Sequence, residues 1–192
     1  MPAEERRARD RAAQRRLIVA TARRLAEGKG WDAVTTRRLS EEIEYSQPVL
    51  YKHFSGMDEI AAAVAVDGFA ELADALAKAR ASARTPRERL RRLACAYIDF
   101  ARNSPALYDA MFTRSTTLQF AVTKTPSELQ TAFAELREVM AEIADDQDAD
   151  TLTEVLWAAL HGLATLARSG RLRPGLDSDR VELLVAQLSS GK

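Results

Sequence analysis

The chain has 192 residues, 46% of them hydrophobic, and its few glycines and prolines favour an all-helical protein of one large or two small domains. Its 28 basic and 28 acidic side chains cancel, but residues 1–55 hold 12 basic and 8 acidic ones and residues 56–192 hold 16 and 20, so a basic first part precedes an acidic remainder. The single cysteine excludes an internal disulfide and a thiolate metal cluster, and the charged N-terminus and short apolar runs argue against a signal peptide and a membrane span, so we expect a soluble cytoplasmic protein.

The first helix is expected from Asp10 to Glu27, with Gly28 as the glycine that ends it. Its buried stripe is expected to comprise Leu17, Ile18, Thr21, Ala22 and Leu25. Residues 1–9 are polar, and we expect them to be frayed. The alternative is a basic arm that contacts phosphates or a minor groove through Arg6, Arg7, Arg9 and Arg11.

Two short helices follow, and their spacing predicts a helix-turn-helix over Thr35–Phe54. Thr35 or Thr36 is a suitable cap for the first of them, because a threonine hydroxyl accepts a free first-turn N–H. Its buried face is formed by Val34, Leu39 and Ile43. Glu44 and Tyr45 are expected to form the turn, and Ser46 to cap the second helix.

The second helix, Gln47–Phe54, is expected to bury Leu50 and Phe54 and to present its other side outward. That outward side carries an amide, a cation, an imidazole and a phenol, which are groups that read base edges and hold phosphates. It comprises Gln47, Val49, Tyr51, Lys52 and His53. The alternative is a helix pair that never touches DNA, since this shape occurs in other proteins.

The remainder is expected to be a helical body. A long helix over 57–83 comes first, and Thr85–Glu88 reads as a capping box for a helix over 86–102. Ser104-Pro105 opens a helix to Phe112, residues 113–124 form a loop, and Thr125–Glu128 is a second capping box for a helix to Ala144. Residues 145–150 are expected to be a solvated acidic loop.

The last two helices are expected at 151–169 and 178–188. The first is apolar on nearly every face, which predicts burial all round. We expect both to pair with their copies as a four-helix homodimer interface. The alternative is that they only close the core of the monomer.

Residues Thr35–Phe54 closely resemble the reading head of the tetracycline-repressor (TetR-like) family, in which a T-T-R-x-L helix precedes a Q-P-x-L-Y-x-H helix. The resemblance extends over about Leu17–Ile60, and the run W-A-A-L-H-G at 157–162 is similar to the motif of its W-H-G subclass. Two departures stand out. Glu44 replaces a turn glycine, at a cost of roughly 1 kcal/mol if the backbone is kept, and the lysine that clamps a phosphate at the start of the next helix is missing.

The resemblance implies an all-α regulator with an N-terminal DNA-binding domain at 1–56 and a C-terminal ligand-binding and dimerisation domain at 57–192. It implies a homodimeric repressor of a palindromic operator, released by a small apolar or amphipathic effector. The residues themselves predict no metal, cofactor or enzymatic activity, because neither His53 nor His161 has a second metal ligand at helical spacing and the sequence has no phosphate loop or nucleophile elbow. The expected DNA-binding residues are Thr36, Arg37, Gln47, Pro48, Val49, Tyr51, Lys52 and His53. The expected ligand contacts, which are otherwise ordinary core residues, are Tyr97, Phe100, Asn103, Tyr108, Met111, Phe112, Phe133, Trp157 and His161.

Two other functions are weighed against the repressor. A non-specific DNA-architectural dimer would bind all sequences alike with a steep dependence on salt. A helical-bundle enzyme would use His161 as a general base and would need no operator. The sequence does not distinguish repression from activation.

Overall fold

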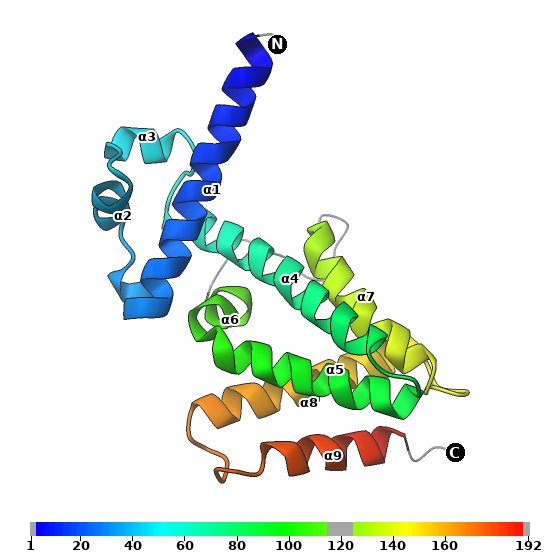
Figure 1. Ribbon diagram of the computed structural model, residues 1–192. Coiled ribbons are helices and arrows are strands. Elements are labelled where there is room, and N and C mark those ends of the chain that lie inside the picture. Colours follow the sequence, from blue (N-terminus) through cyan, green and yellow to red (C-terminus); the bar gives the residue numbers. More distant parts are fainter. Residues whose placement is uncertain (1–2, 115–124, 190–192) are drawn as a thin grey trace. The chain divides into compact units, whose positions relative to one another are not determined.

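The structure, a computed structural model, describes residues 3–114 and 125–189, which form helices joined by turns and short loops (Figure 1). No strand occurs in these residues, so the predicted all-α fold is confirmed. The predicted loop at 113–124 lies almost wholly outside the described residues. The elements are α1 (Ala3–Lys29), η1 (Trp31–Ala33), α2 (Thr36–Ile43), α3 (Gln47–Tyr51), α4 (Met57–Ala81), α5 (Pro86–Asn103), α6 (Pro105–Phe112), α7 (Ser127–Ala141), α8 (Ala149–Arg168) and α9 (Asp177–Leu188).

Residue contacts divide the chain into two compact units. The first lies within Met1–Gly68 and Ser104–Thr125, and the second within Phe69–Asn103 and Pro126–Lys192. The division falls inside α4, after Gly68, whereas the sequence-based boundary falls after residue 56. The helix-turn-helix therefore shares a unit with α6, which follows it by some fifty residues of chain.

In the first unit α1 packs against η1, α2 and α6. The indole Nε1 of Trp31 donates to the backbone oxygen of Ala106 over 2.7 Å. The carboxylate of Glu27 accepts the backbone N–H groups of Ala106 at 3.1 Å and of Leu107 at 2.9 Å. These N–H groups belong to the first turn of α6, where they have no partner within the helix and where a negative charge is favourable. Glu27 and Trp31 thus fix the start of α6 to α1 and η1.

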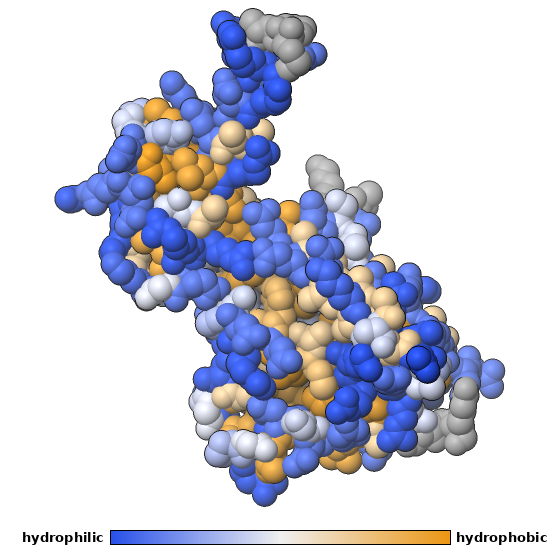
Figure 2. All heavy atoms as spheres, in the orientation of Figure 1, coloured by the Kyte–Doolittle hydropathy of each residue, from blue (hydrophilic) through white to orange (hydrophobic). Residues whose placement is uncertain are grey.

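The start and end of α1 differ from the prediction. The helix begins at Ala3 rather than Asp10, because residues 3–9 are good helix formers and Glu4 and Glu5 lie favourably in the first turn. The surface at this end of α1 is hydrophilic (Figure 2). The helix also continues through Gly28, and Gly30, with φ 79°, follows its end instead. Of the predicted stripe, only Leu17 is exposed, at 43%.

In the second unit α5 packs against α7, α8 and α9. The predicted capping box at its start is present in a shifted form. Thr85 Oγ1 accepts the N–H of Glu88 over 3.2 Å, and Glu88 Oε2 accepts the N–H of Arg84 over 3.1 Å. The second predicted capping box is wrong, because Pro126 occupies the cap position of α7 without a side-chain bond, and α7 ends at Ala141 rather than Ala144.

Helix α8 begins where Asp148 accepts the N–H of Thr151 over 2.7 Å, so the acidic loop supplies its cap. The prediction that this helix is buried all round is wrong for the single chain. Its buried residues are Thr153, Leu156, Leu160 and Ala164, which form one face. On other faces Val155 is 51% and Leu166 is 38% exposed. No described helix is long and apolar enough to cross a bilayer.

Candidate nucleic-acid interface

The first helix of the predicted pair, α2, begins as the sequence indicates. Thr35 has extended backbone angles, and its Oγ1 accepts the N–H of Arg38 over 3.2 Å. The predicted apolar face is confirmed, since Val34, Leu39 and Ile43 are all buried. These contacts anchor α2 and leave Arg37 on its solvent side.

The turn between α2 and α3 keeps the geometry that a glycine would favour, although Glu44 stands there. Glu44 has φ 56° and ψ 33°, in the left-handed region, and its N–H donates to the oxygen of Ser40. The N–H of Tyr45 donates to the same oxygen over 3.0 Å. A non-glycine residue pays roughly 1 kcal/mol for this conformation. The local fold therefore keeps the turn at a cost in stability.

Helix α3 is shorter than predicted. It covers Gln47–Tyr51, with Pro48 in its first turn, and Lys52 and His53 continue as a tight turn in place of a helix to Phe54. The N–H of His53 donates to Leu50 over 2.9 Å, a three-residue spacing that tightens the chain after the helix. Ser46 occupies the cap position, as expected, but its side chain makes no cap bond.

Most of the residues predicted to contact DNA are accessible on the surface of this pair of helices. The side chain of Tyr51 is 54% exposed. Gln47, Pro48 and Lys52 are also exposed, whereas Thr36 and Val49 are half-buried. Arg37 and Gln47 line one shallow depression between α2 and α3, so the fold brings a cation from the first helix beside an amide from the second.

The guanidinium of Arg37 is paired with Glu41 over 2.9 Å. Both side chains are largely exposed, at 81% and 63%, so the pair adds little stability. A phosphate group can replace this carboxylate at low cost. Arg37 therefore remains suited to a phosphate contact.

His53 is half-buried, and its ring Nε2 lies 3.1 Å from Oε1 of Gln14 on α1. Burial lowers the pKa of His53 from its ordinary value, and the charges of Arg11, Arg15 and Lys52 lower it further. The imidazole is therefore mainly neutral near pH 7. The segment that follows α3 is thus bonded to α1 through His53 and Gln14.

Sequence reasoning missed Arg15, which lies on α1. Its Nη1 donates to the backbone oxygen of His53 over 2.7 Å and to Glu59 Oε1 over 3.3 Å, and its guanidinium lies 4.0 Å from the centre of the Phe54 ring. The local sequence carries no signal for these contacts, because the partners lie about forty residues away.

Glu59 completes this arrangement at the start of α4. Its Oε2 accepts the N–H of Ser55 over 2.8 Å and the Ser55 hydroxyl over 3.0 Å. The Ser55 N–H lowers the pKa of the Glu59 carboxyl and outweighs the effect of its partial burial. In the absence of DNA this N–H is therefore paired with a carboxylate.

The nine predicted ligand contacts are divided between the two units. Tyr108, Met111 and Phe112 lie on α6 in the first unit, and the other six lie in the second. Within the second unit the indole Nε1 of Trp157 donates to the hydroxyl of Tyr97 over 3.1 Å. His161 Nε2 lies 3.5 Å from Thr165 Oγ1, and burial lowers the pKa of this histidine. Phe100 and Phe133 are half-buried and Asn103 is exposed.

A short helix held outward beside a capped partner, with an amide, a phenol and an ammonium group on its open side, defines a helix-turn-helix DNA-binding protein. A family model for bacterial regulatory proteins of the tetR family matches residues 18–64. A second model, for the tetracyclin repressor-like C-terminal domain, matches residues 90–189, which is just over half of the chain. The chain belongs to the TetR family of transcription regulators, whose members are generally not enzymes.

A curated relative supports this assignment, and solved structures share the fold. The HTH-type transcriptional regulator YobS of Bacillus subtilis is 34% identical over 95 residues, which are 50% of this chain and 49% of that protein, so the match spans about half of the relative. A protein of unknown function from Rhodococcus sp. RHA1 has a TM-score of 0.78 at 27% identity, over 92% of this chain and 94% of that one. The regulator FadR from Bacillus subtilis, solved with stearoyl-CoA, shares the fold, with a TM-score of 0.66 at 11% identity over 88% and 97% of the chains.

Proposed function

We propose that this protein is a homodimeric, ligand-responsive transcription repressor that binds a palindromic operator. The observation that carries the proposal is the open side of α3, where Tyr51 is 54% exposed beside Gln47. A phenol and an amide make contacts to base edges that a general cationic surface does not make. This combination favours specific recognition over an architectural role.

Each exposed residue has a role in this proposal. Gln47, Val49 and Tyr51 meet base edges or thymine methyl groups in the major groove. Thr36, Arg37, Lys52 and His53 contact phosphates, and Pro48 sets the start of the reading helix. The basic residues at the start of α1 add phosphate contacts, since they lie on a helix that extends to Ala3.

The apolar surface of α8 and α9 supports the dimer. Val155 and Leu166 on α8 are exposed, and Leu183 on α9 is 63% exposed. Three large apolar side chains left exposed on two consecutive helices of one unit are typical of a surface that another subunit covers. A two-fold dimer through these helices presents two reading helices to half-sites about 34–36 Å apart.

The effector in this proposal is a small apolar or amphipathic molecule that binds among those predicted aromatic residues that lie in the second unit. The FadR structure, which shares the fold, contains stearoyl-CoA, an amphipathic acyl ligand. Release requires that the effector bind more tightly to a state whose two reading helices no longer fit the operator.

The test is selection of bound sequences from a random duplex pool at about 0.15 M salt, near physiological ionic strength. The repressor proposal requires an enriched inverted repeat, and the spacing of its arms reports the dimer geometry. Equal binding of all sequences with a steep salt dependence would support the architectural alternative. If the protein bound no DNA and showed an enzymatic turnover that was lost in His161→Ala, the helical-bundle enzyme alternative would be supported.

The enriched duplex then serves as a reporter for regulation. Placed upstream of a promoter in a cell-free transcription reaction, it should reduce transcript yield when the protein is added. An increase in yield would show activation instead of repression and would contradict this part of the proposal.

A further inference from the structure

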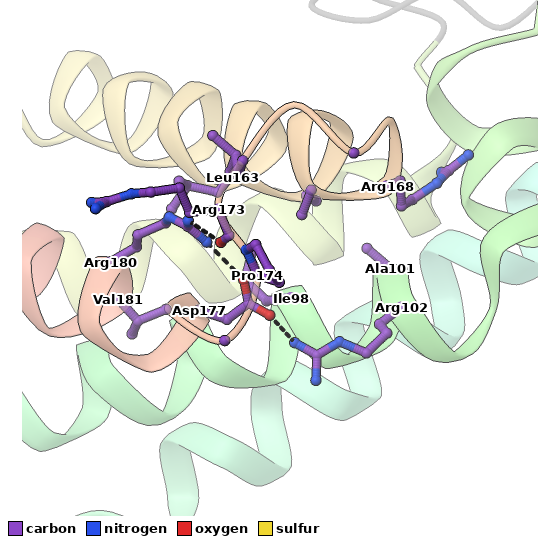
Figure 3. A pocket seen from close by; sticks show the side chains of 15 residues that line it. Ile98, Ala101, Arg102, Leu163, Arg168, Arg173, Pro174, Asp177, Arg180 and Val181 are labelled. Atoms are coloured by element: carbon purple, nitrogen blue, oxygen red, sulfur yellow. Dashed lines mark hydrogen bonds and ion pairs between the residues drawn. The ribbon is translucent and has the colours of Figure 1, made fainter.

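A pocket of about 530 Å³ lies within the second unit, apart from the residues predicted as ligand contacts (Figure 3). It is bounded by α5, the end of α8, the loop of residues 169–176 and the start of α9. Ile98, Leu163 and Val181 contribute apolar surface to its lining. Its volume is in the range of pockets that bind drug-sized molecules, roughly 300–1,000 Å³.

The charged side chains of this pocket are mostly cationic. Four arginines line it, Arg102, Arg168, Arg173 and Arg180, against a single carboxylate, that of Asp177. The two oxygens of Asp177 are already engaged, one by Arg102 over 2.9 Å and the other by Arg180 over 3.0 Å, as the dashed lines in Figure 3 show. The lining therefore has a net charge of +3, and its only carboxylate is shared by two guanidinium groups.

The loop that contributes Arg173 has a defined conformation. Gly170 and Gly175, with φ 66° and φ 77°, flank the segment in the left-handed region, which glycine adopts without strain. Arg180 Nη2 donates to the backbone oxygen of Arg173 over 2.5 Å. The guanidinium of Arg173 has no carboxylate partner among the residues that the structure describes. Arg173 thus belongs to the lining of the pocket and remains able to pair with an external anion.

We propose that this pocket binds a small amphipathic anion, a molecule with a carboxylate or sulfonate group on an apolar body. The anionic group pairs with the guanidinium of Arg173, because arginine forms charge-assisted and often bidentate bonds to such groups. The apolar body lies along Ile98, Leu163 and Val181. This site goes beyond the proposed function, because it shares none of the nine predicted contacts and its occupancy does not require DNA.

The experiment compares two fluorescent probes of one skeleton on the full chain at about 0.15 M salt, where charges more than roughly 8 Å apart are screened. One is 1-anilinonaphthalene-8-sulfonate, which carries the anion, and the other is N-phenyl-1-naphthylamine, which lacks it. The sulfonate probe should bind about tenfold more tightly than the neutral probe, because it adds one charge-assisted hydrogen-bonded contact. Octanoate should displace it and octanol should not.

Variants locate the site. Arg173→Glu and the milder Arg173→Gln should weaken sulfonate binding, by about tenfold and about fivefold, because both remove the pairing guanidinium. Arg171→Glu is the matched control, since Arg171 lies in the same loop and does not line the pocket, and it should change affinity less than about twofold. Circular dichroism checks that each variant is folded, and Arg173→Gln keeps the test valid if the charge reversal unfolds the loop.

Three results would overturn the proposal. They are equal binding of the two probes, equal loss of affinity in Arg171→Glu and Arg173→Gln, and displacement by octanol as effective as by octanoate. Because no DNA is present, failure here leaves operator binding untouched, and failure of operator binding leaves this result valid.

Discussion

Arg15 on α1 donates from Nη1 to the backbone oxygen of His53 over 2.7 Å, just after the end of α3. The same guanidinium bonds Glu59 at the start of α4 and stacks on Phe54. The Arg15 side chain thus contacts His53 after α3, the buried anchor Phe54, and Glu59 in the first turn of α4. This arrangement makes Arg15 a positioning residue for α3.

Replacement of Arg15 should therefore weaken operator binding without removal of a phosphate contact. Arg15→Ala is expected to lower operator affinity by roughly tenfold, since hydrogen bonds from a charged group contribute about 1.5–3 kcal/mol and this one is partly exposed. The slope of log affinity against log salt should stay unchanged. A slope reduced by about 0.9 would mean that Arg15 contacts a phosphate, and would contradict the positioning role.

Tyr51 is the most direct test of the reading face. Tyr51→Ala should weaken binding to the selected operator by ~1–3 kcal/mol, the usual worth of a specific base contact. Because the side chain is exposed, the free energy of unfolding should change little. Fluorescence anisotropy with specific and scrambled duplexes measures both affinities. If the variant bound the operator as well as the wild type, the assigned face would be wrong.

Substitutions of Glu44 should measure the free-energy cost of its left-handed backbone conformation. Glu44→Gly is expected to raise the free energy of unfolding by about 0.5–1 kcal/mol, because glycine adopts the observed φ of 56° without the Cβ clash. The control is Glu44→Ala, which removes the carboxylate but keeps the Cβ. Urea unfolding of both variants separates the two causes. Equal stabilisation by alanine would assign the effect to charge instead of backbone.

The exposed apolar residue of α9 should be needed for dimerisation. Leu183→Arg is expected to produce monomers at micromolar concentration in sedimentation velocity, because it places an unpaired charge in the proposed interface. Leu17→Arg, at an exposed leucine of α1 outside that interface, is the matched control and should remain dimeric. Dissociation by both variants, or by neither, would count against the α8–α9 interface.

Both histidines should titrate below about 6.5, the ordinary value. Burial, followed by nearby arginine and lysine charges, lowers the pKa of His53, and burial followed by Arg168 lowers that of His161. A lowered pKa means that the folded protein binds protons less well than the unfolded chain. The two histidines therefore do not lower the free energy of unfolding above about pH 6.5. They lower it as the pH falls from about 6.5 toward their pKa values in the folded protein. Proton NMR of the imidazoles, assigned with His53→Gln, measures both midpoints, and a value above 6.5 for either would contradict its environment.

Several features of the reading head could be predicted from the sequence because their causes are local. The cap at Thr35 depends on a hydroxyl three residues before the N–H of Arg38. The strained turn at Glu44 and the buried anchors Leu50 and Phe54 follow from the same short pattern. The start of α6 at Pro105 is a further example, since proline fits the first turn of a helix.

Sequence-based predictions were wrong for the burial of α8 and for the start of α1, which depend on more than a short local pattern. Apolar residues all round α8 predicted complete burial, but periodicity cannot distinguish a face covered by the same chain from one left open, as at Val155. The early start of α1 depends on propensity accumulated over several residues, none of which is a strong signal alone.

By itself the sequence determined the helical class, the pair of short helices with its cap at Thr35 and the identity of the exposed side chains on α3, because each depends on residues within one or two turns of each other. Only the tertiary structure decided how α3 is held and where a cationic pocket lies. The contact from Arg15 to His53 spans 38 residues and that from Arg102 to Asp177 spans 75. Such pairs meet only after the helices pack, and no local pattern of charge or hydropathy specifies which distant partner will lie opposite.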